Sequence, residues 1–279
     1  MQAKKLQQKI VGLIPAAGKA ERISPLPCSK EIYPVGFDDS SENEILRPKA
    51  VSQYLIESMQ LVSVSDVYII IRKGKWDILN YLGSGNWMDM NFAYLIMDLP
   101  FGVPFTLDQA YNFIKDDIVV FGFPDIIFRP KDAFNRLLDK GSSSRADVVL
   151  GLFLAPQPYK TQHMVDFDSE GQVYGFQIAP SQTTLQYTWI IAVWNQKFTC
   201  FLHEYVSSEA KNFRKDRAEK KDSMVEEVSM TQAFQVALQT GFEIDSVTFE
   251  EGSFVDIGSP ENLDKVSQIS LEFVTPGRK

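Results

Sequence analysis

The residues best suited to chemistry lie near the start of the chain. A short apolar run, residues 10–15, leads into Ala16-Ala17-Gly18, and the cations Arg22 and Lys30 follow at well-separated positions. Small residues let the backbone turn tightly, so that successive N–H groups can point at phosphate oxygens. An arginine and a lysine can neutralise the charge of a triphosphate or of departing pyrophosphate. The segment therefore favours a phosphate-binding loop that serves phosphoryl or nucleotidyl transfer.

Two familiar phosphate-binding patterns are absent from this segment. No Gly-Lys-Ser/Thr ends the loop, as a Walker motif requires, and the three spaced glycines of a dinucleotide-binding loop are missing. Judged from the residues alone, an ordinary junction between a strand and a loop is the competing interpretation.

Residues 12–31 as a whole resemble the signature of the sugar nucleotidylyltransferases, the family of glucose-1-phosphate thymidylyl- and uridylyltransferases. That signature is a small-residue loop followed by an arginine and then by a lysine in a Pro-x-Lys-type motif. Three later motifs follow in the family's order: Leu107-Asp108-Gln109-Ala110, which resembles the helix start near the nucleotide base, then Gly122-Phe123-Pro124-Asp125, and residues 255–261, which contain Asp256. The resemblance covers most of the chain, and the joint occurrence is more specific than any single motif.

The resemblance implies transfer of a nucleotidyl group from an NTP, dTTP or UTP, to a sugar 1-phosphate, giving an NDP-sugar and pyrophosphate. It implies that Asp125 and Asp256 hold one Mg²⁺, since hard carboxylate oxygens suit this cation. Arg22 would bind the leaving pyrophosphate, and Lys30 would steady the α-phosphate and the sugar phosphate. Arg22, Lys30 and Asp125 are thus the expected catalytic residues, without a protein nucleophile. The expected nucleotide-binding residues are Pro15, Ala16, Ala17, Gly18 and Gln109.

Two departures from the family pattern concern the nucleotide and the acceptor. Glu21 stands beside the loop, where the family has a threonine, and its charge would repel a triphosphate unless it points away. Ile178-Ala179-Pro180 replaces a Glu-Lys-Pro turn that contacts the sugar, and Trp189 adds bulk to the expected sugar pocket. His163 and His203 are interpreted as structural or surface residues, because this kind of transfer needs no general base.

The elements that must position these residues follow from hydrophobic periodicity. Apolar or alternating runs predict strands, helical spacing predicts helices, and a turn between two short runs predicts a hairpin. Strands are expected at residues 10–15, 67–71, 92–97, 118–123, 148–153, 189–194 and 242–249, with a hairpin at 165–168 and 173–178. Helices are expected at residues 50–62, 106–113, 133–138 and 226–240, and the charged residues 207–227 form an exposed helix or a mobile loop.

Strands that alternate with helices favour an α/β fold with ligands bound at the carboxyl ends of the strands. We expect a Rossmann-like three-layer α/β/α arrangement with a mixed, mostly parallel central sheet, which by resemblance is the nucleotide-diphospho-sugar transferase type. The polar segment 37–47 predicts a surface loop over the site. No hexapeptide repeat follows Gly258, so residues 1–279 are expected to form a single nucleotidyltransferase domain without an appended β-helix.

Composition narrows the classes of partner. The chain of 279 residues is 44% hydrophobic and 23% charged, which suits a globular protein with a large core. Its formal net charge of -8 argues against a nucleic-acid partner. Two distant cysteines indicate neither disulfides nor zinc, and no apolar run is long enough for a membrane span or a signal sequence. A cytoplasmic protein without a membrane partner is expected, and a homo-oligomer is compatible with the sequence.

Two other hypotheses remain open. One is a nucleotide-binding regulatory protein that keeps the fold without turnover, which Glu21 and the altered acceptor turn motivate. The other is a cytidylyltransferase that acts on a non-sugar phosphate. Retention of both metal carboxylates together with Arg22 and Lys30 favours an active enzyme.

Overall fold

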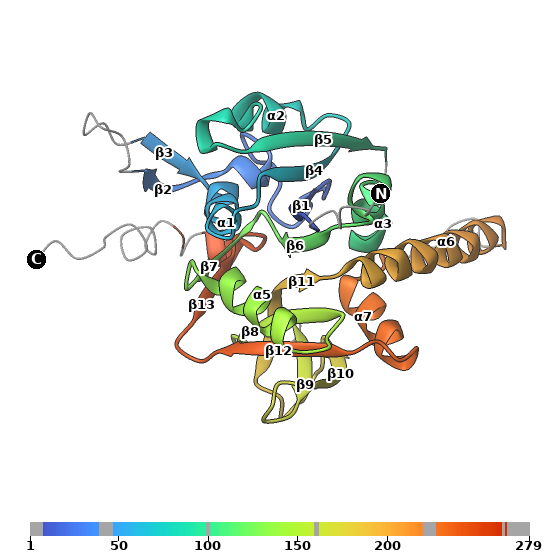
Figure 1. Ribbon diagram of the computed structural model, residues 1–279. Coiled ribbons are helices and arrows are strands. Elements are labelled where there is room, and N and C mark those ends of the chain that lie inside the picture. Colours follow the sequence, from blue (N-terminus) through green and yellow to red (C-terminus); the bar gives the residue numbers. More distant parts are fainter. Residues whose placement is uncertain are drawn as a thin grey trace, which may run out of the picture.

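A mixed β-sheet forms the centre of the computed structural model, which describes residues 8–38, 47–98, 101–158, 162–219, 227–263 and 266 (Figure 1). The sheet has nine strands: β1 (Ile10–Ala16), β4 (Asp66–Arg72), β5 (Asn91–Met97), β6 (Ile118–Gly122), β8 (Val148–Leu154), β9 (His163–Phe167), β10 (Val173–Ile178), β11 (Tyr187–Trp194) and β12 (Ile244–Phe249). Strands β6, β1, β4 and β5 run parallel in that order, and β12 is parallel to β8. The expected mixed sheet is confirmed.

Strand β11 joins the parallel part of the sheet to the rest. It runs antiparallel to β6 through Ile191–Trp194 and antiparallel to β8 along its whole length. Near its start, Thr188 pairs with Met164 of β9, and β9 forms the predicted hairpin with β10. Strands β6 and β9 therefore pair with the same edge of β11, β6 at Ile191–Trp194 and β9 at Thr188. The two residues of β11 between them pair with neither strand.

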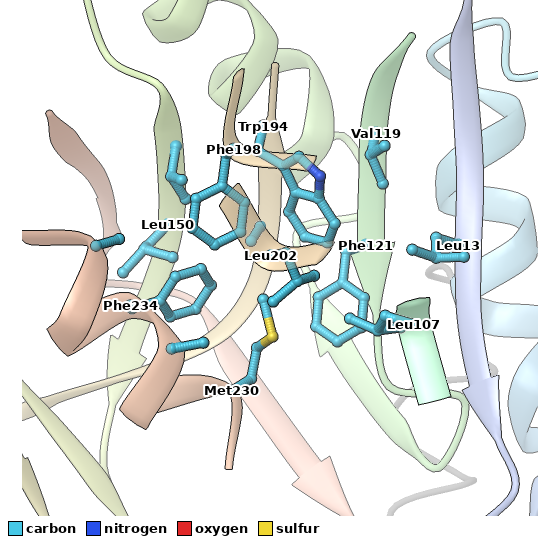
Figure 2. Close-up of a cluster of buried hydrophobic side chains, with 14 of the residues drawn as sticks. Leu13, Leu107, Val119, Phe121, Leu150, Trp194, Phe198, Leu202, Met230 and Phe234 are labelled. Carbon is cyan, nitrogen blue, oxygen red and sulfur yellow. The ribbon is translucent and has the colours of Figure 1, made fainter. Parts of the chain in front are cut away.

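Helices cover both faces of the sheet and give the expected three layers. One face carries α1 (Val51–Gln60), α2 (Trp76–Leu82) and α5 (Ala133–Ser143), and the other carries α3 (Val103–Asp108), α4 (Tyr111–Ile114), α6 (Gln196–Glu219) and α7 (Met230–Gln239). Successive side chains of β1 alternate between the two cores: Leu13 packs with the second group of helices, and Ile14 with the first. Figure 2 shows the core beneath α3, α6 and α7, where Phe121 and Trp194 of the sheet meet Phe198 and Phe234.

Two small antiparallel pairs lie outside the main sheet and were not expected from the sequence. They are β2 (Pro34–Asp38) with β3 (Arg47–Ala50), and β7 (Ile126–Arg129) with β13 (Ser253–Asp256). Each strand has only four or five residues, too few for an alternating pattern to be distinctive. Residues 39–46 of the predicted surface loop lie outside the described residues.

Most predicted elements are confirmed, and one helix is corrected. The helix predicted at residues 106–113 begins earlier, at Val103, and is divided into α3 and α4. Gly102 ends the preceding loop with φ +123°, and Pro104 occupies the first turn of α3. The charged segment from residue 207 continues α6 as a helix to Glu219, and residues 220–226 are outside the described part. None of the described helices is both long and apolar enough to cross a membrane.

Candidate active site

A cavity of about 420 Å³ opens at the carboxyl ends of β1 and β6. It lies beside Trp189 and Ile190, the part of β11 between the residues that pair with β6 and the residue that pairs with β9. The parallel neighbours β1 and β6 are connected through opposite faces of the sheet, because α1 follows β1 on one face and α3 and α4 precede β6 on the other. The cavity therefore lies at a topological switch point, where open α/β sheets bind ligands.

The small-residue loop after β1 forms one wall of the cavity. Pro15, Ala17 and Gly18 line it, together with Arg22 and Lys30. A side chain added at Gly18 would lie 4.0 Å from Lys30 Cε, so the loop passes close to this lysine. The predicted association of a small-residue loop with two cations is therefore present in three dimensions.

Two carboxylates lie opposite these cations. Lys30 Nζ donates a hydrogen bond to Asp125 Oδ2 over 2.5 Å, and both side chains are largely buried. A carbon atom added at Gly258 would lie 2.8 Å from Asp256 Oδ1, 3.0 Å from a terminal nitrogen of Arg22 and 3.5 Å from Asp125 Oδ2. Both cations and both carboxylates expected from the sequence therefore converge on one point of the cavity.

The pairing of β7 with β13 brings the two aspartates together. Asp125 immediately precedes β7, and Asp256 ends β13 opposite Ile126. The Ile257 N–H donates to the carbonyl of Asp125 over 3.0 Å, and the Gly258 N–H donates to Asp256 Oδ1 over 2.7 Å. Backbone hydrogen bonds thus fix the positions of two carboxylates that are 131 residues apart, from 125 to 256.

The two carboxylates have different proton affinities. Burial raises the pKa of Asp125, but the charge and hydrogen bond of Lys30 outweigh it and hold the pKa below its usual value. Burial and the charge of Asp125 raise the pKa of Asp256 above its usual value. Burial lowers the pKa of Lys30, but the negative charges of Asp125 and Glu31 together outweigh this effect. The pKa of Lys30 is therefore above its usual value. Lys30 is therefore a permanent cation at neutral pH.

A buried ion pair connects the loop to neighbouring elements, and one of its members, Glu31, also lines the cavity. Lys75 Nζ lies 2.6 and 2.7 Å from the two carboxylate oxygens of Glu31, and it also donates to the carbonyl of Ala16 over 3.0 Å. Lys75 is 5% exposed and Glu31 1%. This contact ties the end of β1 to the short 3₁₀ helix that carries Lys30 (Lys30–Ile32) and to the start of α2.

Two predicted nucleotide-binding residues do not line the cavity. Ala16 is buried in the core, and it contributes only the carbonyl that Lys75 binds. The Gln109 side-chain amide donates to the carbonyl of Phe105, one turn back along the helix. The motif that contains Gln109 ends α3 instead of starting it. The cavity is lined in its place by Gly102, directly before α3, and by Val103 and Thr106 of the helix.

Glu21 does not approach the cavity. Its carboxylate lies 3.4 Å from Lys19 Nζ, and its side chain is 76% exposed. The repulsion of a triphosphate that the sequence suggested is weakened by this exposure and by the neighbouring lysine.

Apart from Trp189, the remaining polar residues of the cavity lining were not predicted from the sequence to belong to the site. Ile178-Ala179-Pro180 does not line the cavity, but His163, directly opposite Ile178 in the hairpin, does. Gln162, Thr188, Glu227 and Ser229 add polar groups, and Trp189 supplies the expected bulk. His163 lies two residues before the strand predicted at 165–168, so the sequence pattern did not indicate that it lines a cavity.

The donor set suits a hard divalent cation. Asp125 and Asp256 offer carboxylate oxygens, and Mg²⁺ commonly binds one or two carboxylates together with substrate phosphates and water. Among the described residues, no cluster of three or more His, Cys, Asp or Glu residues could form a cage made entirely of protein. The site therefore fits a cation that arrives with a phosphorylated ligand.

Comparisons with known proteins agree with this architecture. No family model matches the chain. Over 264 residues, or 94% of its length, the chain is 24% identical to the low-salt glycan biosynthesis nucleotidyltransferase Agl11 of Haloferax volcanii, and it spans 66% of that protein. The fold matches a protein assigned as a glucose-1-phosphate thymidylyltransferase from Bacillus anthracis (TM-score 0.73, 18% identity, 94% and 95% of the two chains covered). It also matches the inositol-1-phosphate CTP transferase from T. maritima (TM-score 0.68, 15% identity, 98% of both chains covered).

Proposed function

We propose, on the premise that this chain resembles the sugar-1-phosphate nucleotidylyltransferases in sequence and in fold, that it is a nucleotidyltransferase. It joins an NTP, dTTP or UTP, to a sugar 1-phosphate and releases pyrophosphate, giving an NDP-sugar. The observation that carries the proposal is the convergence of Arg22, Lys30, Asp125 and Asp256 in one cavity at the carboxyl ends of the strands.

In this proposal the protein positions two anionic reactants and offsets their charge. Backbone groups of the loop at Ala17 and Gly18 hold phosphate oxygens, and Arg22 binds the pyrophosphate that leaves. Lys30 exchanges part of its contact with Asp125 for the α-phosphate and the acceptor phosphate, where negative charge builds during the reaction. The acceptor phosphate oxygen is itself the nucleophile, so the side chains need only hold the reactants in line.

Mg²⁺ is the proposed cofactor, held by Asp125 and Asp256. It would supply charge neutralisation at the phosphates when bound. The raised pKa of Asp256, caused by burial and by the charge of Asp125, supports this assignment because a cation near both carboxylates would relieve their repulsion.

A second candidate differs in base and acceptor. The fold also matches a CTP transferase for inositol 1-phosphate, and the acceptor wall here carries His163 and Trp189 in place of the sugar-contacting turn expected from the family. A cytidylyltransferase that uses a non-sugar phosphate is therefore the alternative. The third hypothesis is a nucleotide-binding protein without turnover. It was based on Glu21 and on the altered acceptor turn, and the exposed position of Glu21 removes the first of these two arguments.

Pyrophosphate release from the purified protein tests these proposals. Each NTP is combined with Mg²⁺ and with a panel that includes glucose 1-phosphate, other sugar 1-phosphates and inositol 1-phosphate. Release that requires dTTP or UTP and a sugar 1-phosphate is the expected result, whereas release that requires CTP and inositol 1-phosphate would establish the second candidate. Nucleotide binding by calorimetry without release from any pair would favour the regulatory protein. Lys30→Ala protein, purified in parallel, controls for contaminating activity.

A further inference from the structure

A chain of hydrogen-bonded side chains ends at the acceptor wall of the cavity, the part of the lining formed by His163, Thr188 and Trp189. The indole N–H of Trp189 donates to Thr231 Oγ1 over 2.8 Å, and the same hydroxyl oxygen lies 2.5 Å from His163 Nδ1. Thr231 is fully buried at the start of α7, and Trp189 is 6% exposed. Both Trp189 and His163 belong to the cavity wall.

The hydrogen-bonding capacities of these groups fix which nitrogen of His163 carries the proton. An indole nitrogen can only donate, so Thr231 Oγ1 must accept from Trp189. Among the residues that the structure describes, the only acceptor recorded for the Thr231 hydroxyl proton is His163 Nδ1. A buried hydroxyl that keeps its proton unbonded is costly, so Thr231 donates to Nδ1. A neutral imidazole whose Nδ1 accepts carries its proton on Nε2.

The surroundings keep this arrangement rigid. Phe123 and Phe234 hold the Trp189 ring, with ring centroids 5.6 and 5.2 Å away. The His163 backbone is fixed by pairing with Ile178 and by the Thr188 hydroxyl, which donates to the His163 carbonyl over 3.0 Å. Burial lowers the pKa of His163, so the ring is neutral at pH 7 and presents a donor without a charge. In the described part of the chain, no group is recorded as a partner of Nε2.

We propose that His163 binds the acceptor substrate by donating its Nε2 proton to a hydroxyl oxygen of a polyhydroxylated ring phosphate, with Thr231 and Trp189 as positioning residues. This inference rests on the proposed function, because it assigns the acceptor to this end of the cavity. The small-residue loop follows β1 and the two carboxylates belong to the β7–β13 pair, whereas His163 belongs to β9. In the proposed function the nucleotide and the acceptor phosphate take the contacts of the loop and the carboxylates, which leaves the ring of the acceptor to face His163. A neutral donor recognises a hydroxyl without adding affinity for phosphate or pyrophosphate.

The tautomer can be read directly from the wild-type protein. The chain contains only two histidines, so a spectrum of ¹⁵N-histidine-labelled protein that correlates ring nitrogens with ring protons contains two sets of signals. His203→Gln identifies the set of His163. We expect a protonated Nε2 and an unprotonated Nδ1 at pH 7, with a shift of the Nε2 signal when glucose 1-phosphate or inositol 1-phosphate is added. A protonated Nδ1, or no shift with either compound, would overturn the proposal even if the protein proves to have no transferase activity.

Two substitutions test the same donor by kinetics. Glutamine places an amide N–H near the position of Nε2, whereas asparagine is too short and replaces only the Nδ1 side. His163→Asn is expected to raise the KM for the acceptor roughly tenfold, the effect of one lost hydrogen bond, with the KM for the NTP within about twofold of wild type. His163→Gln should keep the acceptor KM within about threefold. Equal acceptor KM values for wild type and His163→Asn would refute the role of His163, and an unchanged NTP KM shows that the variant is folded.

The two acceptor classes give distinguishable results. If sugar 1-phosphates and inositol 1-phosphate both serve as acceptors, the larger KM increase in His163→Asn identifies the ring whose hydroxyl meets Nε2.

The positioning role of Thr231 has its own test. Thr231→Val should change the His163 spectrum to a mixture of tautomers, which a purely structural role of Thr231 would not produce.

Discussion

At the scale of single residues, Gly258 lies where Arg22, Asp125 and Asp256 meet. Its backbone lies against Asp256, Arg22 and Asp125, and its N–H holds Asp256. Its φ is outside the left-handed region, so the absence of a side chain matters here for space and not for backbone conformation. In the proposed function, a methyl group at this position would compete with the phosphates and the cation for the same volume.

Gly258→Ala is therefore expected to lower pyrophosphate release about tenfold or more, because the methyl group must displace a carboxylate or Arg22. The melting temperature should change little. Gly141→Ala is the matched control: its added carbon would meet only Val149 at 3.5 Å, an ordinary contact, and an alanine favours helix α5. Wild-type activity in Gly258→Ala would show that reactants do not occupy this point.

The two aspartates are expected to act as a pair. Asp125→Asn and Asp256→Asn should each reduce Mg²⁺-dependent release at least about 100-fold, the range seen when one electrostatic contact to a transition state is removed. The double variant should lose little more than either single one, since both residues serve one cation. Asp116→Asn, an exposed aspartate outside the cavity, is the control. Full activity in either single variant would remove the metal assignment.

At the scale of elements, the Lys75–Glu31 ion pair joins the end of β1, the 3₁₀ helix of Lys30 and the start of α2. Both groups are nearly inaccessible to water, so each needs the other. This pair holds the small-residue loop through the Ala16 carbonyl, and Glu31 also lines the cavity. It belongs to the support of the site, and its loss should first affect stability.

Lys75→Met should lower the free energy of unfolding by about 3–5 kcal/mol at pH 8, because the Glu31 carboxylate is left buried without its partner. Burial already raises the pKa of Glu31, and removal of Lys75 takes away a charge that lowers it. A group whose pKa is higher in the folded state stabilises the fold more as the pH falls. The deficit of Lys75→Met should therefore be smaller at pH 5 than at pH 8 in urea denaturation, and Lys75→Met/Glu31→Met should recover part of it. A deficit that does not depend on pH would contradict this account.

At the scale of the whole molecule, the cavity exists because two parts of one sheet share an edge of β11. The loop before α3 also meets the segment before α7: the Val228 N–H donates to the carbonyl of Phe101 over 3.0 Å, and Gly102 pairs with Val228. Segments from both parts of the chain therefore line one site. A ligand bound there contacts both parts and should stabilise the fold as a unit.

Addition of Mg²⁺ with the preferred NTP is expected to raise the melting temperature. At a concentration 100 times the dissociation constant, binding adds about 2.7 kcal/mol to the stability. For a chain of this size, we expect an increase of roughly 5 °C or more in differential scanning fluorimetry. Chelation of Mg²⁺ should abolish most of this increase in wild type, and Asp125→Asn/Asp256→Asn should show little increase with or without chelator. An equal increase with and without Mg²⁺ would argue against a cation at these carboxylates.

The sequence by itself determined the strands of the main sheet, most helices and four of the charged residues that line the cavity. Long apolar runs indicate buried strands, and Asp125 closely follows one of them, whereas Arg22, Lys30 and Asp256 were identified from the resemblance of their motifs. The short strands β7 and β13 gave no comparable signal, although their pairing is what brings the two aspartates together. The sequence motif also placed Gln109 at the site, whereas the start of α3 lies earlier, at Val103.

Only the tertiary structure decided which residues line the part of the cavity around His163. His163 and Ile178 are neighbours because a hairpin pairs them, and His163 faces the cavity because β6 and β9 take separate places along β11. Thr231 reaches His163 from a helix that begins 67 positions after it, from 163 to 230. Local periodicity reports which face of an element is buried, but contacts between distant elements depend on register and packing that no local pattern contains.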